Sequence, residues 1–212
     1  MSNFSPNQNL AKELFLVSRQ QKEALNGQKA FVIWLTGLSG AGKSTIARSL
    51  EVSLFNNGTR TLILDGDNTR MSINRDLDFS ALGRQENIRR VAEMAKLLND
   101  AGVVVITAFI SPFKADREMA KAIIGEDCFV EVFIDSPLEV CIERDTKGLY
   151  RKALNGELKD FTGISSPYEV PENPILNVNT DSQRLDESVE NILSELFKDR
   201  LIKVSSKHLI RL

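Results

Sequence analysis

A glycine-rich stretch at residues 37–45, GLSGAGKST, matches the spacing G-x-x-x-x-G-K-[ST]. Glycines at these positions let backbone amides approach phosphate oxygens without interfering side chains, and the N-terminal end of a following helix adds positive charge. Lys43 is expected to reach the β and γ phosphates of a nucleotide, and Ser44 to ligate Mg²⁺. The stretch therefore predicts a nucleoside triphosphate site with Mg²⁺ rather than an ordinary glycine-rich turn, and its residues are Gly37, Leu38, Ser39, Gly40, Ala41, Gly42, Lys43, Ser44 and Thr45.

Two carboxylates and an arginine follow the next apolar run, in the order Asp65-Gly66-Asp67-Asn68-Thr69-Arg70. Ligands of open α/β sheets bind beyond the carboxyl ends of the strands. A carboxylate there can hold Mg²⁺ or accept the proton of an attacking hydroxyl, as phosphoryl transfer requires. Asp65 and Asp67 could instead be turn formers, because Asp-Gly and Asp-Asn pairs favour turns. The phosphate-binding stretch nearby favours the catalytic interpretation.

A GTP-dependent switch is disfavoured by the motifs that the sequence lacks or misplaces. No Asn-Lys-x-Asp sequence is present to recognise guanine, and the only Asp-x-x-Gly, Asp145 to Gly148, follows a helical stretch late in the chain. The motifs taken together are those of an ATP-using kinase.

Short apolar runs and helical periodicities alternate along the chain and must position these groups. Near-continuous apolar runs are typical of strands buried on both faces. The alternation predicts an α/β fold with a mostly parallel, doubly wound sheet of about five strands and helices on both faces. The expected strands are Phe31 to Leu35, Thr61 to Leu64, Val103 to Phe109, Phe129 to Ile134 and Ile175 to Val178, and the expected helices include Ile46 to Leu54, Ile88 to Leu98 and Leu185 to Leu196.

Length and composition exclude several classes of protein. The 212 residues fit one domain, and a net charge of −2 supplies no positive field for a nucleic-acid partner. Cys128 and Cys141 are too few for a disulfide framework, and the N-terminus lacks a secretory signal. The longest apolar run, Val103 to Ile110, is far shorter than the ~18 residues that span a bilayer. We expect a reduced, cytoplasmic protein without a membrane segment.

Two long stretches, residues 68–84 and 146–174, do not fit the alternating pattern. Loops of this length in a compact domain are usually binding loops or lids. We expect residues 1–28 to form an N-terminal, helical extension, residues 29–200 a kinase domain with a lid at about 146–174, and residues 201–212 a C-terminal tail.

Seven motifs, in order, carry a resemblance to a known family: GLSGAGKST, LDGDNTR, NRDLDFS, RQENIRRVAE, FISP, DSPLEVCIERDTKGLYRKA and DFTGISSPYE. With these motifs the chain resembles adenylylsulfate kinase over about Arg19 to Thr180. The resemblance implies the P-loop NTPase fold with a lid, the use of ATP and Mg²⁺, and a homodimer. It also implies phosphorylation of the 3′-hydroxyl of adenosine 5′-phosphosulfate (APS) to give 3′-phosphoadenosine 5′-phosphosulfate, a step in sulfate activation.

The resemblance also implies roles for single residues. Asp65, together with Ser44, is implied to ligate the metal, and Asp67 is the better general base for the sugar hydroxyl. Ser111 matches a serine assigned as a phosphorylated intermediate in bacterial members. Phe79 and Phe161 match aromatics that stack on adenine, although periodicity alone would make both of them packing residues. The implied catalytic residues are Lys43, Asp65, Asp67 and Ser111; the implied substrate contacts are Asp67, Arg70, Phe79, Arg84, Asn87, Ile110, Ser111, Lys147 and Phe161, and further ATP contacts are Arg144 and Thr180.

Four positions depart from the family pattern. Met71-Ser72 stands where many members have His-Gly, Asp78 where they have Gly, and Gly83 where they have Asp. These positions lie on the acceptor side, so they bear on loop conformation and substrate affinity, and Asp78 adds negative charge beside a site for an anion. Two alternatives stay open: a P-loop kinase of another small hydroxyl compound, and a weakly active nucleotide-binding partner of the sulfate-activating enzyme.

Arg89 and Arg90 belong to the helix expected around Ile88 to Leu98. Arginine is mostly exposed in proteins, and Glu86 and Glu93 lie about one helical turn away. We therefore expect the two arginines to form a solvated, ion-paired helix face rather than to bind substrate.

Overall fold

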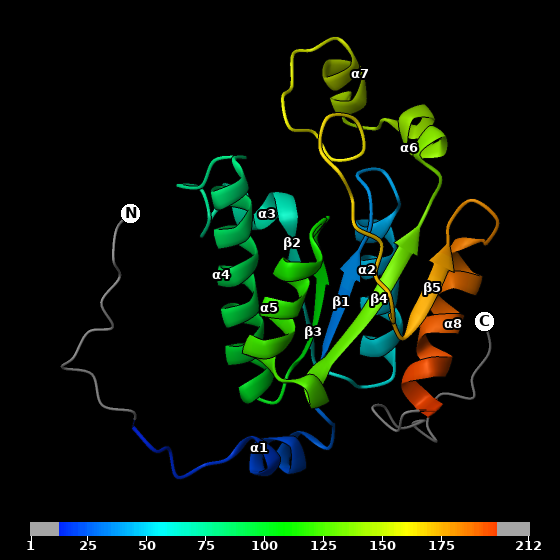
Figure 1. The fold of residues 1–212 in the computed structure, drawn as a ribbon. Coiled ribbons are helices and arrows are strands. Elements are labelled where there is room, and N and C mark those ends of the chain that lie inside the picture. Colours follow the sequence, from blue (N-terminus) through cyan, green and yellow to red (C-terminus); the bar gives the residue numbers. More distant parts are fainter. Residues whose placement is uncertain (1–12, 199–212) are drawn as a thin grey trace.

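The sheet that the apolar runs predict is present in the computed structural model, which describes residues 13–198 (Figure 1). Within this range five strands pair in parallel, in the order β2-β3-β1-β4-β5. Each strand begins and ends within one residue of the expected run. The strands are β1 (Val32–Thr36), β2 (Thr61–Asp65), β3 (Val104–Ala108), β4 (Phe129–Asp135) and β5 (Leu176–Asn179).

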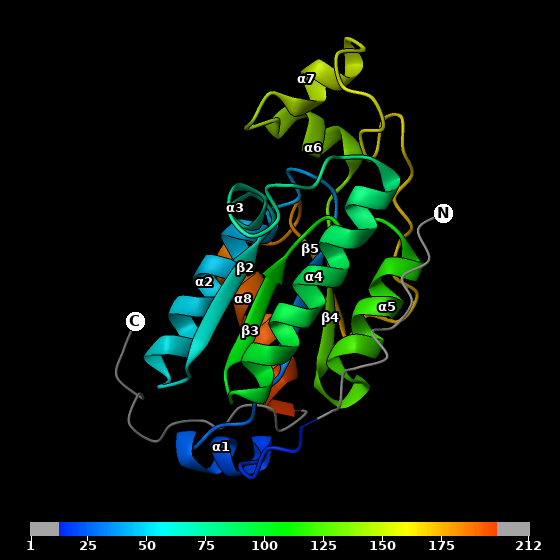
Figure 2. The same cartoon turned by 90° about the vertical axis from the view of Figure 1, so that its left-hand side faces the viewer.

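Helices cover both faces of the sheet. Successive residues of a strand point to opposite faces, so alternate side chains of β1 pack in different clusters. Ile33 and Leu35 of β1 belong to the buried cluster that includes residues of α2 (Lys43–Asn56) and α8 (Leu185–Lys198). Trp34 belongs to the opposite cluster, with residues of α4 (Ala81–Asp100) and α5 (Lys114–Ile124). Figure 2 shows α4 and α5 on one side of the sheet and α2 on the other. The doubly wound α/β fold is confirmed, and α5 adds a helix that the apolar pattern does not predict.

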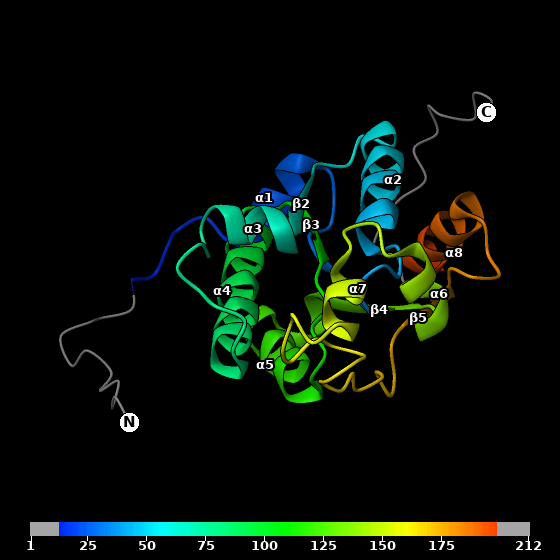
Figure 3. The ribbon, with the colours of Figure 1, turned by 90° about the horizontal axis from the view of Figure 1, so that it is seen from above.

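Several elements cluster beyond the carboxyl ends of the strands. A loop at residues 37–42 joins β1 to α2, α3 (Gly66–Met71) follows β2, and α6 (Leu138–Arg144) and α7 (Leu149–Leu154) follow β4. Figure 3 looks down on this edge, with α7 over the middle of the molecule and α3 and α6 on either side. Both stretches that we expect to be loops therefore contain helix. Residues 72–80, between α3 and α4, are called the α3–α4 loop below.

Helix α1 (Arg19–Asn26) lies at the opposite end of the sheet from α6 and α7 (Figure 1). Ser18 begins it with a capping box, in which the Ser18 hydroxyl accepts from the Gln21 N–H and the Gln21 side chain accepts from the Ser18 N–H. A short 3-10 helix, η1 (Glu126–Cys128), leads into β4. Helix α1 lies within the predicted N-terminal extension, whereas residues 1–12 and the predicted tail at 201–212 lie outside the described residues.

Two further expectations can be compared with the structure. Between residues 13 and 198 no helix is both long enough and apolar enough to cross a membrane. Cys128 and Cys141 are buried and unpaired. Both thiols thus lie in the core as small side chains.

Candidate active site

The phosphate-binding loop packs tightly against β4 and holds its own lysine. A Cβ atom at Gly37 would lie 2.4 Å from the carbonyl oxygen of Ile134, so glycine is required there. The buried Lys43 Nζ donates to the carbonyls of Gly37 at 2.8 Å and Leu38 at 2.6 Å. Burial lowers the pKa of Lys43 to about 8. Because charged acceptors bind an ammonium more strongly than carbonyls do, phosphate oxygens would be better partners for this lysine.

Arg144, in α6, and Thr180, just after β5, contact the same loop. Arg144, the last residue of α6, donates to the Gly40 carbonyl at 3.4 Å and to the Thr180 carbonyl at 2.8 Å. The Thr180 hydroxyl donates to the Ala41 carbonyl at 2.9 Å. Within residues 13–198 Arg144 forms no ion pair with a carboxylate. Both predicted ATP contacts therefore touch the loop, and the guanidinium charge stays available to a nucleotide.

Tyr150 is a third residue that contacts this loop, and the sequence motifs do not single it out. It lies in α7, is 1% exposed, and donates its hydroxyl to the Ser39 carbonyl at 2.9 Å. Burial raises its pKa, so the hydroxyl stays protonated and remains a donor. Tyr150 thus ties the stretch 146–174 directly to the phosphate-binding loop.

Ser44 and Asp65 bring oxygen atoms together at the start of α2. The Ser44 hydroxyl donates to Asp65 Oδ2 at 2.7 Å. Asp65 Oδ1 caps α3, because it accepts the N–H groups of Asp67 at 3.0 Å and Asn68 at 3.4 Å. Hydroxyl and carboxylate oxygens fit Mg²⁺, which usually takes its other ligands from phosphates and water. The described residues contain no cluster of three or more His, Cys, Asp or Glu side chains suited to a metal.

Asp67 makes a different contact from Asp65. Its carboxylate accepts a hydrogen bond and forms an ion pair with Lys147, in the stretch 146–174. The Asp67 side chain is 62% exposed and that of Lys147 is 55% exposed. The two carboxylates therefore have different surroundings. Asp65 caps a helix and accepts from Ser44, whereas Asp67 faces solvent and contacts Lys147.

Arg84 joins the α3–α4 loop to the stretch 146–174. Its side chain donates to the Phe79 carbonyl at 2.9 Å, to the Thr162 hydroxyl at 3.2 Å and to the Asp160 carbonyl. Arg84 lies in the first turn of α4. One arginine thereby fixes the segments that carry the two predicted adenine-stacking rings.

The two rings have different surroundings. Phe79 is 67% exposed, and the Arg70 guanidinium lies 4.3 Å from its centroid. Phe161 is half-buried and packs edge-on against Tyr150, with the centroids 5.0 Å apart. The packing interpretation thus describes Phe161 in part, while Phe79 offers an open apolar face to a ligand.

Hydrogen bonds join the Ser111 hydroxyl to those of Thr36 and Tyr168. It is 2% exposed and has a left-handed φ of 38°. Its hydroxyl accepts from Trp34 Nε1 at 3.1 Å and donates to Thr36 Oγ1 at 2.9 Å. Thr36 donates its own proton to the Ile110 carbonyl at 2.8 Å, so the Tyr168 hydroxyl, 2.9 Å away, is the donor to Thr36. The single proton of Ser111 therefore goes to another hydroxyl and not to a base.

We expect Ser111→Ala to keep measurable turnover. A serine nucleophile needs a base within hydrogen-bond reach, and among residues 13–198 no partner of the Ser111 hydroxyl is a carboxylate or an imidazole. Loss of two neutral hydrogen bonds should lower kcat by about tenfold or less. With ATP chiral at the γ-phosphorus, one inversion is expected. Complete loss of activity in the variant, together with net retention in the wild type, would place a phosphoserine on the pathway.

Asp78 and Gly83, which both depart from the family pattern, are in contact. Ser80 is the N-cap of α4 and accepts from the Gly83 N–H at 3.1 Å. In a capping box an acid at position 83 would accept the Ser80 N–H in return, which glycine cannot do. Asp78 Oδ1 takes this place, accepting from the Ser80 N–H at 3.1 Å and from its hydroxyl at 2.6 Å. The bonds to Ser80 lower the pKa of Asp78, so its negative charge is engaged at the helix N-terminus.

The contact predicts that the two positions are coupled. A Cβ at position 83 would lie 2.2 Å from Asp78 Oδ1 and 2.6 Å from the Asp78 carbonyl oxygen, so Gly83→Asp should lower Tm by about 5 °C. Asp78→Gly alone should lower Tm by a few degrees, because it removes the cap. The double variant should regain part of the Tm lost in Gly83→Asp. Glycine at 78 removes the carboxylate clash and gives the backbone freedom to shift away from the new Cβ, and the acid at 83 can then cap Ser80. Additive losses in thermal denaturation would show that the two departures are independent.

The chain is similar to known proteins in both sequence and fold. The family model for adenylylsulphate kinase matches residues 29–179. An adenylyl-sulfate kinase of Prochlorococcus marinus is 52% identical over 187 residues, which cover 88% of this chain and 93% of that protein. The Mycobacterium tuberculosis APS kinase, solved in complex with AMPPNP and APS, has 42% sequence identity and a TM-score of 0.77 over 80% of this chain and 99% of that one.

A more distant similarity concerns the fold alone. Shikimate kinase from Acinetobacter baumannii is 18% identical, with a TM-score of 0.53 over 85% of this chain and 99% of that chain. The parallel sheet with its phosphate-binding loop is therefore the fold of P-loop kinases. The chain belongs to the adenylylsulphate kinase family.

Proposed function

We propose that this protein transfers the γ-phosphoryl group of ATP to the 3′-hydroxyl of APS, giving 3′-phosphoadenosine 5′-phosphosulfate and ADP. Membership of the family supports the reaction. The position of Asp67 carries the proposal. It lies two residues from the Asp65–Ser44 pair at the phosphate-binding loop and contacts Lys147, from the stretch that also bears Phe161.

In the reaction the 3′-oxygen attacks the γ-phosphorus in line, and the bond to the β,γ-bridging oxygen breaks as ADP leaves. Asp67 accepts the proton of the hydroxyl. Lys43 leaves its two carbonyl partners and stabilises charge on the transferring group, while Lys147, released from Asp67, neutralises phosphate charge from the opposite side.

Mg²⁺ would be held by Ser44 and Asp65, whose oxygens are already 2.7 Å apart. A Mg²⁺ ion held by these two residues would offset the negative charge of the phosphates. The Asp65 cap on α3 keeps its carboxylate oriented for this task without a second protein ligand.

The acceptor is proposed to lie between the α3–α4 loop and the stretch 146–174, which would act as the lid. Flat apolar rings suit adenine, and guanidinium groups suit a phosphosulfate. The lid is joined to the rest of the site by Tyr150, Lys147 and Arg84. The proposed acceptor contacts are Asp67, Arg70, Phe79, Arg84, Asn87, Ile110, Ser111, Lys147 and Phe161, and the proposed further ATP contacts are Arg144 and Thr180.

Two finer statements belong to the same proposal. A homodimer is implied by the family, and sedimentation of the purified protein tests it. A cytoplasmic location is supported by two unpaired, buried cysteines and by the need for ATP.

A panel of acceptors tests the proposed function against its alternatives. With ATP and Mg²⁺ fixed, ADP formation is measured with APS, AMP, adenosine, shikimate and gluconate. APS should give a kcat/KM at least ~10³-fold above the others, because a site built for a charged group rejects analogues that leave it unpaired. A higher kcat/KM with another hydroxyl compound would identify a different kinase. ATP binding without turnover of any acceptor would indicate a weakly active nucleotide-binding partner.

A further inference from the structure

The α3–α4 loop is positioned by polar contacts rather than by apolar burial. Two of its apolar side chains, and that of Met71 just before it, face solvent: Met71 is 73% exposed, Ile73 56% and Phe79 67%. The structure describes all of residues 72–80. Among them Asn74 is the only buried residue, and Leu77 is half-buried. Exposed apolar groups contribute little to holding a loop in place, because burial is what stabilises them.

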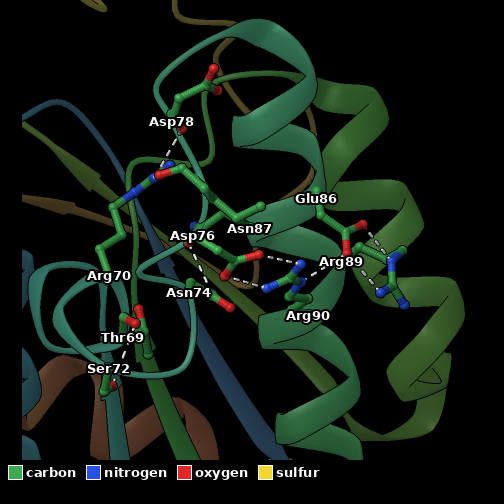
Figure 4. A network of polar contacts seen from close by, with 11 residues as sticks. Thr69, Arg70, Ser72, Asn74, Asp76, Asp78, Glu86, Asn87, Arg89 and Arg90 are labelled. Carbon is green, nitrogen blue, oxygen red and sulfur yellow. Dashed lines mark hydrogen bonds and ion pairs between the residues drawn. The ribbon is translucent and has the colours of Figure 1, made fainter.

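Two contacts on one face of α4 hold this loop (Figure 4). Arg90 donates from Nη1 and Nη2 to the two carboxylate oxygens of Asp76, at 2.8 and 2.9 Å. The buried Asn74 Nδ2 donates to Asn87 Oδ1 at 3.0 Å, which leaves the Asn87 amide nitrogen to donate elsewhere. Asn87 and Arg90 are three residues apart in α4, so their side chains are neighbours.

Arg90 is itself held in place by a neighbour on α4. Its Nε donates to Glu86 Oε1 at 2.9 Å, and Glu86 also accepts from Arg89 Nε at 2.7 Å. These hydrogen bonds, first that of Arg89, lower the pKa of Glu86 to about 2. The expected pairing with Glu86 is present for both arginines, and Arg89 also pairs with Glu93 at 3.6 Å. The expectation was incomplete for Arg90, because its guanidinium also forms a bidentate ion pair with Asp76 in the α3–α4 loop. This bidentate pair is called the fork below.

The loop in turn is joined to an arginine that we assign to the acceptor. Arg70 Nη1 donates to the carbonyls of Leu77 at 3.3 Å and Asp78 at 3.0 Å, and its guanidinium lies over the Phe79 ring. A displaced loop would therefore move Arg70 and Phe79 together.

We propose that Arg90 is a positioning residue for the acceptor substrate, which acts through Asp76 to hold the α3–α4 loop in its binding conformation. This inference rests on the proposed function, since the loop is assigned to APS there. Arg90 touches neither nucleotide in this role. Loss of the fork lowers the fraction of molecules with a competent loop, and the apparent affinity falls by the same fraction.

A double-mutant cycle tests the proposal. Arg90→Ala and Asp76→Ala should each raise KM for APS about fivefold, the upper range for an exposed ion pair. KM for ATP and kcat should stay within about twofold, because the phosphate-binding loop is untouched. The double variant should also show about a fivefold rise, because either change alone already breaks the fork. Arg90→Lys should restore part of the affinity, since it keeps the charge but not the bidentate geometry.

Arg89→Ala is the matched control. Arg89 is adjacent on α4 and shares Glu86, but its ion pairs are with Glu86 and Glu93 and not with the loop, so KM for APS should not change. Hydrogen exchange at residues 72–79 should become faster in Arg90→Ala and not in Arg89→Ala, with or without substrate. Equal exchange in the two variants, or a double variant whose KM effect is the product of the two single effects, would overturn the inference. Failure of wild-type protein to phosphorylate APS would overturn the proposed function instead, and the exchange result would still stand.

Discussion

Lys43→Ala is expected to lower kcat by ~10³-fold or more. The Lys43 ammonium is buried in the phosphate-binding loop and bonds to two carbonyls of its own loop. These partners are weak compared with phosphate oxygens, so the charge is available when the transferring group becomes more negative. Alanine removes that charge at the point where it acts in the transition state.

The fold should survive this change, because Lys43 contacts loop carbonyls and forms no ion pair with another described residue. Steady-state kinetics gives kcat, and thermal denaturation gives the stability of the variant. Lys96→Ala is the control, since Lys96 is a half-buried residue of α4 that pairs with Asp100 at 3.7 Å and lies outside the proposed site. Wild-type kcat in Lys43→Ala would contradict the assignment of residues 37–45 to phosphate.

Asp67→Asn is expected to lower kcat by ~10²-fold or more, with a modest change in KM for APS. Asparagine keeps the size of the side chain but cannot accept the proton of the 3′-hydroxyl. The effect should fall on kcat, because the proton moves in the transition state and not on binding. Steady-state kinetics with APS varied at saturating ATP separates the two constants.

Asp65→Asn is the informative comparison. Asp65 caps α3 and accepts from Ser44, so its loss should raise the Mg²⁺ concentration needed for half-maximal rate, whereas Asp67→Asn should leave that concentration nearly unchanged. A rise in KM for APS at unchanged kcat in Asp67→Asn would make Asp67 a binding residue and leave the reaction without its proposed base.

The strands could be predicted to within one residue because they are short, largely apolar runs. In β1 and β3 the run is nearly continuous, as burial on both faces requires, whereas the edge strands β2 and β5 are only partly buried. Helix α5 could not be predicted in this way. Two of its buried positions are charged: Asp116 and Arg117 are each 4% exposed. Arg117 pairs with Glu131 of β4 at 3.0 Å and donates to the Ser111 carbonyl at 2.8 Å. Its partners lie on other elements, so no apolar periodicity indicates them.

In the candidate site, too, some residues are indicated by the sequence and others only by the packed structure. Residues 37–45 and the pair Asp65 and Asp67 could be predicted because each motif is contiguous and its chemistry follows from residue type. The contact of Tyr150 with Ser39 joins residues 111 positions apart, and the Arg90–Asp76 fork joins a helix to a loop. Such contacts depend on how the elements pack, and a single sequence does not encode that in any local pattern.

Ser111 illustrates how residue type alone can mislead. A serine after a strand, at the edge where substrates bind, suits a nucleophile as well as a structural hydroxyl. Its surroundings distinguish the two: Trp34 donates to it and Thr36 accepts from it, both from β1. These hydrogen bonds favour a role in shaping the site. Their partner residues lie 75 or more positions from Ser111 in the sequence.

The most direct test is to locate the transferred phosphate. Purified protein is incubated with Mg²⁺, APS and ATP labelled at the γ-phosphate, beside Lys43→Ala protein as the control. The label should appear on APS in one-to-one ratio with ADP, and a nucleotidase specific for 3′-phosphates should release it. Label at another position, or no label on APS above the Lys43→Ala control while ATP is still bound, would contradict the assignment of this protein as an APS 3′-kinase.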